Sequence, residues 1–168
     1  MKYLSTLCLA LLVSFTAISQ IDSSKNGVFT ENISEADSKV ISYAKITYKN
    51  GIKDGPFEGF KEDGTLHLKG TFKNGKLDGK HFTYFKNGEL ERKTFYKDGK
   101  EHGERTVYYS NGNVLYKVSY KDGEKHGKYV EYYENKKLKA DGQYINGKRV
   151  GDFNTYSKEG VIIETESH

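Results

Sequence analysis

The sequence predicts an all-β fold: an elongated, single-layer antiparallel meander of β-hairpin repeats with about ten strands. Two observations favour this fold. A pattern of glycines and aromatic residues occurs five times at an interval of 24 residues, without insertion or deletion, from residue 48 onward. Between the glycines, apolar residues alternate with polar ones. A fixed period of this size is typical of a stacked array, and alternation is typical of half-buried strands.

Each unit begins with an aromatic residue, and glycines follow three and seven residues later. The aromatic residues are Tyr48, Phe72, Tyr96, Tyr120 and Tyr144, and the first glycines are Gly51, Gly75, Gly99, Gly123 and Gly147. A third glycine recurs late in the unit and fails only at Lys136. Glycine is favoured where the backbone turns with positive φ, so we expect turns at these positions.

Two strands fit into each unit. The segment NVLYKVSYK alternates, and its apolar face consists of Val114, Tyr116, Val118 and Tyr120. The second strand is short and ends at Asn-Gly, as at Asn87-Gly88, where we expect the two-residue hairpin turn with positive φ at both residues. The Asp/Asn-Gly-x-x-x-Gly segment forms the other connection. We expect the first strand within residues 41–49 and the last within residues 161–168.

Three regions divide the chain. Residues 1–19 carry Lys2, an apolar run and the small residues of a cleavage site, which indicates a signal peptide and hence export to the periplasm, the cell envelope or the medium. The single cysteine, Cys8, lies in that run, so we expect no disulfide in the exported chain. Residues 20–40 lack periodicity and are expected to form a flexible leader, with a decayed unit as the alternative. Residues 41–168 form the repeat domain.

Composition and motifs argue against several functions. With 27 basic and 23 acidic residues interspersed, the chain lacks the basic stripe of nucleic-acid-binding domains. Two near matches to a phosphate-binding loop, at residues 70–76 and 142–148, lack the Ser or Thr that binds magnesium. His102 and His126 share one repeat position, but a ladder does not converge on a metal ion. We expect no catalytic site, no metal and no cofactor.

Residues 98–115 (DGKEHGERTVYYSNGNVL) and 122–139 (DGEKHGKYVEYYENKKLK) resemble the bacterial variant of the MORN repeat, a short β-hairpin unit. Proteins built from such units are often grouped as YwqK-family antitoxins of toxin–antitoxin systems. The resemblance covers residues 48–168, and its motif residues are the turn glycines and the ring positions. It implies protein binding, with toxin neutralisation as one role, or membrane association.

Alternation assigns several rings to the face opposite the main aromatic ladder. These candidate partner-binding residues are Phe57, Phe85, Tyr109, Tyr129 and Tyr133. A single-layer sheet cannot cover both faces, and tyrosine is favoured at binding hot spots because it offers a large area with few rotatable bonds. The alternative is that these rings pack against lysine stems and one another.

Lysines line the same polar face. The candidate contacts to an anionic surface are Lys73, Lys97 and Lys121, together with Lys69, Lys93 and Lys117. Each lysine contributes about 1 kcal/mol at an anionic membrane, so we expect a weak, salt-sensitive contact. The alternative is a solubilising face.

We therefore predict an exported, non-enzymatic repeat protein that binds a protein partner, as an antitoxin or immunity protein would. The alternative is an envelope-associated structural protein that contacts anionic lipid or glycan. End-to-end pairing of the sheet with other copies is a further expectation.

Overall fold

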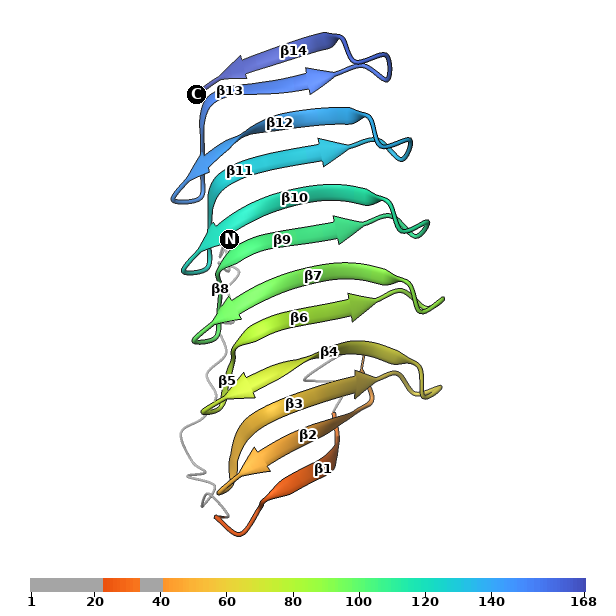
Figure 1. Cartoon of the computed structure of the whole chain (residues 1–168), viewed down its shortest axis with the longest axis vertical. Coiled ribbons are helices and arrows are strands. Elements are labelled where there is room, and N and C mark those ends of the chain that lie inside the picture. The colour runs from red at the N-terminus through yellow and green to blue at the C-terminus, as the bar shows by residue number, and fades with distance from the viewer. Residues whose placement is uncertain (1–22, 34–40) are drawn as a thin grey trace, which may run out of the picture.

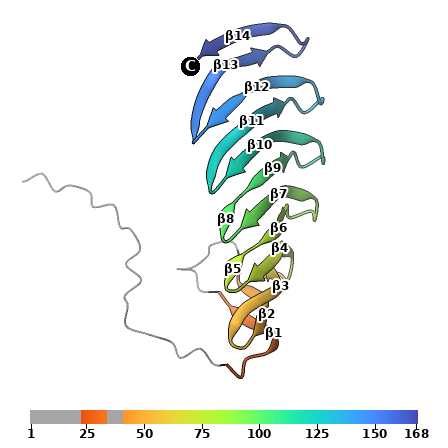
Figure 2. The same ribbon diagram turned by 60° about the vertical axis from the view of Figure 1, so that its left-hand side comes forward.

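A computed structural model describes residues 23–33 and 41–168, and this part of the chain forms one antiparallel β-sheet of fourteen strands (Figure 1). The predicted signal peptide lies outside the described residues. Figure 2 shows the strands curving across the short dimension of the elongated sheet. None of the described residues belongs to a helix that is long and apolar enough to span a membrane.

Strands follow one another across the sheet in chain order, except that the two-residue strands β5 and β8 pair only with β4 and β7, so that β4 also pairs with β6 and β7 with β9. The N-terminal strands are β1 (Gly27–Asn32), β2 (Tyr43–Lys49), β3 (Ile52–Phe60), β4 (Leu66–Lys73), β5 (Lys76–Leu77), β6 (Gly79–Tyr84) and β7 (Leu90–Lys97). The C-terminal strands are β8 (Lys100–Glu101), β9 (Gly103–Tyr108), β10 (Val114–Lys121), β11 (Glu124–Tyr132), β12 (Leu138–Ile145), β13 (Lys148–Tyr156) and β14 (Ile162–Ser167). The predicted meander is confirmed.

The first glycine of each unit lies in a two-residue turn along one long edge of the sheet. At Asn74-Gly75, for example, φ is 48° and 79°, and the four equivalent pairs are also positive at both residues. Positive φ at both positions defines the type I′ hairpin turn. Each turn glycine also donates its N–H to a carbonyl one unit upstream, as Gly75 does to Lys53 at 2.8 Å. These bonds stack the units.

The opposite long edge carries a different turn from the one predicted. At Asn87-Gly88 only Gly88 has positive φ, 85°. Its N–H donates to Phe85 O at 3.0 Å, and the Phe85 N–H donates to Glu89 O at 2.8 Å. This pattern is a type I turn closed by a left-handed glycine, so the prediction of a type I′ turn here is wrong. Lys136 occupies the left-handed position in the fourth unit, with φ of 69°.

The second glycine of each unit lies at an irregularity within the sheet, where the sequence predicted part of a connection. Register shifts occur between Ile46 and Tyr48 opposite Gly55, and between Val118 and Tyr120 opposite Gly127. The φ values of these two glycines are 127° and 106°. Residues 54–56 there face Thr47 alone, so the second strand holds two extra residues, and side chains on either side of the irregularity keep their faces. A bulge of one residue, which does shift the alternation, occurs instead at the start of each first strand, as between Val114 and Tyr116.

β1 lies in the segment that we expected to be a flexible leader. It pairs with β2, placing Phe29 opposite Ile46. Gly51 donates to Lys25 O at 3.0 Å, as Gly75 does to Lys53 O. Lys25 therefore corresponds to Lys53, an offset of 28 residues, and the connection before β2 is four residues longer than the others. The fixed 24-residue frame aligned Gly27 with the wrong glycine, which hid this strand.

The core lies on one face of the sheet, here called the aromatic face because it carries the ring that begins each unit. Buried residues form an N-terminal cluster around Tyr48 and Phe57 and a C-terminal cluster around Tyr120 and Phe153. Large rings alternate with glycine across the strands: a Cβ on Gly70 would lie 2.9 Å from the Phe57 ring. Glycine thus makes room for the ring on the adjacent strand.

Candidate functional site

Four lysines form a row across the opposite face, here called the lysine face. The backbone register aligns Lys45 with Glu58, Glu58 with Lys69, and Lys69 with Phe82. The row continues through Lys93, Thr106 and Lys117. Residues that face each other across a register lie on the same side of a sheet, and lysines on every second strand lie about 9.5 Å apart. Three of the four lysines were predicted; Lys45 was missed because it precedes the first full unit.

Aromatic rings lie beneath the row and hold the ammonium groups. Lys45 Nζ lies 5.2 Å from the centre of the Phe60 ring, and Lys69 Nζ lies 5.6 Å from that of Phe82. Lys93 Nζ lies 5.9 Å from the Phe95 ring. Contacts of this length are cation–π interactions, which orient a lysine without neutralising its charge.

Counter-charges divide the row into two parts. Lys117 Nζ lies 3.7 Å from Glu104, and the next repeat position is acidic, Asp141. In the described part of the chain, Lys69 and Lys93 have no carboxylate within ion-pair distance. A shallow hollow beside them is lined in part by Glu58, Lys69, Lys80 and Phe82. The N-terminal half of the lysine face is therefore the more basic half.

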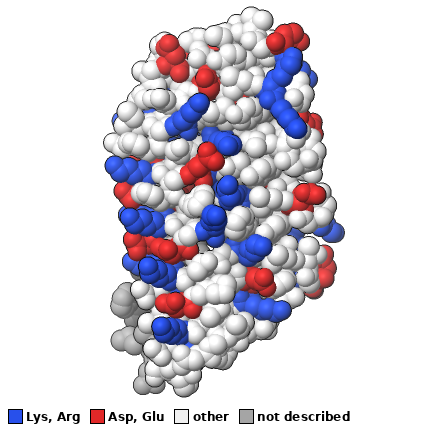
Figure 3. All heavy atoms as spheres, in the orientation of Figure 1, with Lys and Arg blue, Asp and Glu red and all other residues white. Residues whose placement is uncertain are grey.

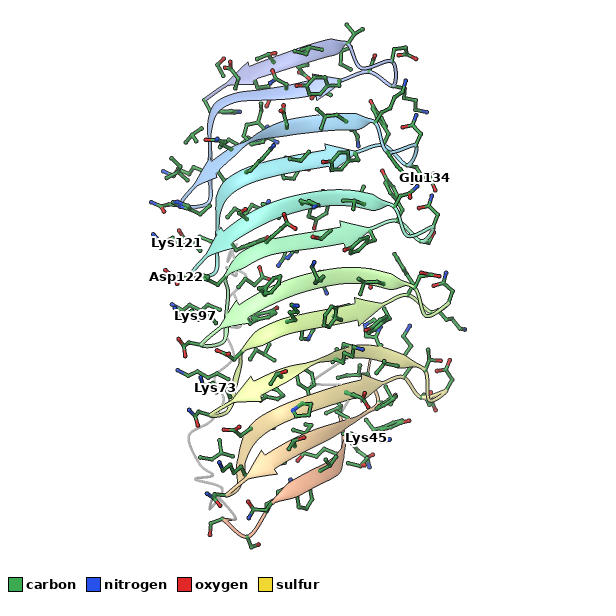
Figure 4. All side chains as sticks on the ribbon, in the orientation of Figure 1. Lys45, Lys73, Lys97, Lys121, Asp122 and Glu134 are labelled. Atoms are coloured by element: carbon green, nitrogen blue, oxygen red, sulfur yellow. The ribbon has the colours of Figure 1, made fainter. Side chains whose placement is uncertain are left out.

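The other predicted lysines lie away from this row. Lys73, Lys97 and Lys121 immediately precede the type I′ turns, and Figure 4 shows them along one long edge of the sheet. Asp98 and Asp122 follow the second and third of them in the chain. Figure 3 shows acidic and basic side chains alternating along this edge. The predicted set of six lysines thus falls into a row on the face and a charge-mixed edge.

Two of the predicted partner-binding rings lie on the aromatic face. Phe57 is 7% exposed and belongs to the N-terminal core cluster, and Tyr129 packs against the C-terminal cluster. Burial and the hydrogen bond to Glu131 raise the pKa of Tyr129 above its usual value. The assignment of these two rings to the opposite face was wrong, since the register places Phe57 opposite Ile46 and Tyr129 opposite Val118, two core residues of the aromatic face. The alternation used for the assignment is interrupted by a one-residue bulge at the start of each first strand, as between Val114 and Tyr116.

The remaining three rings lie at the long edge of the sheet that carries the type I turns. Tyr109 OH donates to Tyr132 O at 2.9 Å, and Tyr133 OH donates to Tyr156 O at 2.7 Å. Phe85 occupies the same repeat position and is half-buried. Each tyrosine ties its hairpin to the next one, and a hollow between two of them is lined by Tyr109, Tyr133, Glu134, Asn135 and Lys158. Tyr109 and Tyr133 therefore have a structural role.

A polar group occupies the middle of the aromatic face, between the two core clusters. Arg105 donates to Glu101 and, at 2.6 Å, to the hydroxyl of Tyr120. Glu101 also accepts from Tyr96 OH at 3.4 Å. The ion pair is largely shielded, since the side chains of Arg105 and Glu101 are 19% and 17% exposed. Sequence reasoning missed this group because its members are scattered over two units.

His81 completes the polar group at its N-terminal end. Its ring centre lies 5.7 Å from that of Phe57 and 5.6 Å from that of Tyr96. Burial, and secondarily the charge of Arg92, lower the pKa of His81 below its usual value. His81 is therefore neutral at pH 7.

The two histidines considered as metal ligands contact the neighbouring type I′ turns. His102 Nδ1 lies 3.5 Å from Asp122, and His126 Nδ1 lies 3.3 Å from the side-chain oxygen of Asn146. Among the described residues, no cluster of three or more histidine, cysteine, aspartate or glutamate side chains could hold a metal ion. Each of the two side chains thus contacts the type I′ turn of the following unit.

Comparison with known proteins gives one family. Four segments match the MORN repeat variant: residues 53–74, 77–98, 101–122 and 125–146. Their starting points are 24 residues apart, which agrees with the period of the sequence. Together they cover more than half of the chain. No curated protein sequence matches it.

Proposed function

Because the chain belongs to the MORN repeat variant family, whose repeats are non-catalytic modules for protein or membrane interaction, we propose that it is exported and binds another protein. We further propose that this binding neutralises the partner, as in an antitoxin or immunity protein. The signal-peptide pattern of residues 1–19 supports export, and the resemblance of the repeats supports the neutralising role.

The observation that carries the proposal is the lysine row. Lys45, Lys69 and Lys93 present three ammonium groups at a regular spacing, held over aromatic rings. Such a row is complementary to a surface with carboxylates at a similar spacing. Electrostatic complementarity of this kind raises association rates and excludes basic partners. We therefore propose an acidic partner that binds the N-terminal half of the lysine face.

The test is a charge reversal with a matched control. The partner is first recovered by affinity capture from envelope and culture-supernatant fractions and identified by mass spectrometry. Lys69→Glu/Lys93→Glu is expected to weaken binding at least about tenfold, because it also places like charges against the partner. Lys73→Glu/Lys97→Glu makes the same change in net charge on the turn edge and is expected to cost less than about threefold. Equal losses in both double variants would show that the row is not the contact surface.

Neutralisation is tested separately from binding. If the captured partner arrests growth when produced alone, co-production of the repeat protein should restore growth, and Lys69→Glu/Lys93→Glu should not. A partner that is harmless when produced alone would contradict the antitoxin role and leave the binding role intact.

The same row favours a second candidate, an envelope protein that contacts anionic lipid. Lys45, Lys69 and Lys93, which form no ion pair in the described part of the chain, contribute roughly 3 kcal/mol at an anionic surface, which corresponds to weak binding that salt removes. Cosedimentation with phosphatidylglycerol vesicles at low ionic strength tests this candidate. Binding that Lys69→Glu/Lys93→Glu abolishes, without any stoichiometric protein partner, would favour it over the first.

A further inference from the structure

The two ends of the sheet correspond to the two halves of one repeat unit. We propose that a second copy of the chain completes this unit: β14 of one molecule pairs antiparallel with β1 of the next, which joins copies head to tail into one continuous sheet. This self-association goes beyond the proposed function and depends on different residues.

β1 is equivalent to the second strand of a unit. Lys25, Asn26 and Gly27 correspond to Lys53, Asp54 and Gly55 of β3. Asn26 accepts a hydrogen bond from the backbone N–H of Asn50 at 2.9 Å, as Asp54 does from that of Asn74 at 3.4 Å. Gly27 and Gly55 share a positive φ, 107° and 127°. In every full unit, the first strand of the unit pairs with the second strand on its N-terminal side, as β2 does with β3; β1 has no such neighbour in the described part of the chain.

β14 is equivalent to the first strand of a unit. His168 occupies the position of Tyr144, and its ring lies 5.8 Å from that of Phe153, edge to face. Tyr144 and Tyr129 make the same contact one unit earlier, at 6.0 Å. In every full unit, the second strand of the unit pairs with the first strand on its C-terminal side, as β13 does with β12; β14 has no such neighbour in the described part of the chain. Each end of the sheet thus lacks the type of strand that the other end offers.

Both edges are open in the described part of the chain, and each exposes apolar side chains. β14 pairs with β13 alone and β1 with β2 alone. Val28 at one end is 66% exposed, and Ile162 and Ile163 at the other are 53% and 62% exposed. β14 contains neither lysine nor proline, the residues that usually protect a free edge from pairing.

The backbone groups of the two edges match in phase. His168 and Gly151 exchange hydrogen bonds, so along β14 the groups of Glu166 and Glu164 face β13, whereas those of Thr165 and Ser167 face outward. In β1, by the same alternation from the bond between Ile33 and Ser42, the groups of Thr30 face outward. The register of Ile46 with Phe57, carried over to the junction, places Thr165 opposite Thr30. The outward-facing backbone N–H and C=O groups of Thr165 and Thr30 would therefore face each other across the junction.

One pair opposes the junction. The same register places Glu164 opposite Glu31, with both side chains on the aromatic face. Like charges directly opposite each other destabilise a strand pair. Because salt screens this repulsion, the association strengthens with added salt. Like any self-association, it also strengthens with protein concentration. The contact joins edges of different type, so every added molecule leaves one free edge of each type, and a junction that continues the elongated sheet gives an open filament.

Disulfide trapping tests the junction and its register. In a Cys8→Ser background, the full chain with Thr30→Cys/Thr165→Cys is expected to give a ladder of dimers, trimers and longer chains on oxidation, because opposed strand residues lie within disulfide distance. Each single-cysteine variant is expected to give little product and nothing longer than a dimer. Glu31→Cys/Thr165→Cys is the matched control, since its two sulfurs would lie on opposite faces. A ladder of equal yield in this control, or none in the first variant, would overturn the proposal.

A charge reversal supplies a second readout that needs no cysteine. Glu164→Lys converts the like-charge pair into an attractive one, and we expect the dissociation constant for self-association, measured by sedimentation, to fall about fivefold. Glu159→Lys makes the same change of net charge in the preceding turn, away from the junction, and should have little effect. An unchanged constant in Glu164→Lys, or equal effects of both changes, would contradict the register.

Discussion

The ends and the middle of the aromatic face are built from the same backbone but filled differently. Apolar rings and aliphatic residues form the clusters at the two ends, around Phe57 and Phe153. In the middle, the equivalent positions hold His81 and Arg105. Turns and register are the same in both regions. The repeated residues therefore determine the sheet, whereas the side chains that cover its aromatic face can differ from unit to unit.

Neighbouring strands compensate for these differences in size. Rings lie beside glycine at the ends: a Cβ on Gly142 would lie 2.6 Å from three atoms of the Phe153 ring. In the middle, His81 lies opposite Thr94, which is 2% exposed. A β-branched residue fits there because no phenyl ring covers its position. The same row of the sheet thus holds a large residue beside a small one, or two of middle size.

The largest effect is expected from filling the space beneath a ring at one end. Gly142→Ala forces the Phe153 ring out of its position, because three contacts of 2.6 Å cannot be accommodated, and should lower the free energy of unfolding by about 2 kcal/mol. Chemical denaturation measures this loss. Phe153→Leu in the same chain should recover part of it by removing ring atoms. Additive losses in the double variant would show that the ring and the glycine do not compensate for one another.

A smaller effect is expected from breaking the ion pair in the middle. Glu101→Ala leaves the shielded Arg105 without its carboxylate and should lower the free energy of unfolding by about 1–2 kcal/mol, less than for a fully buried pair because both side chains retain some exposure. The exposed Glu124→Ala is the control and should change stability by less than about 0.5 kcal/mol. If the two losses were equal, the polar group in the middle would contribute nothing specific.

The smallest effect is a pH dependence that only the middle should show. Since burial lowers the pKa of His81 in the folded chain, its contribution is fully present above the ordinary pKa of about 6.5 and is lost as the pH falls through the lower folded value. His81→Gln should therefore flatten the decline of stability on the acidic side of pH 6.5. Arg92 opposes protonation and Glu101 favours it, so Arg92→Gln should reduce the same decline. Parallel stability curves for wild type and His81→Gln would refute this account.

The sequence was sufficient for the period, the antiparallel meander and the position of the last strand. Each of these follows from glycines and rings that recur in phase, and the local preference of those residues agrees with the fold. Three lysines of the row were also identified, because residues one period apart on equivalent strands must lie in line.

Face assignments failed where local geometry interrupts the alternation. Phe57 and Tyr129 were assigned to the wrong face because a one-residue bulge at the start of each first strand, as between Val114 and Tyr116, interrupts the alternation, and no residue type marks this bulge in the sequence. β1 was missed because its connection to β2 is four residues longer than in the full units. Contacts such as that of Arg105 with Glu101 depend on side-chain conformations that a repeat pattern does not encode.

The uniform spacing of the turns has a consequence for how the length of such a molecule can change. Every unit joins the next through the same hydrogen bond from a turn glycine, so deleting or duplicating one 24-residue unit creates only junctions of a kind already present. Each such event shortens or lengthens the sheet by about 9.5 Å, two strand spacings. Recombination between units can therefore change the length of the sheet in fixed steps of one unit, while every contact between units stays of the same kind.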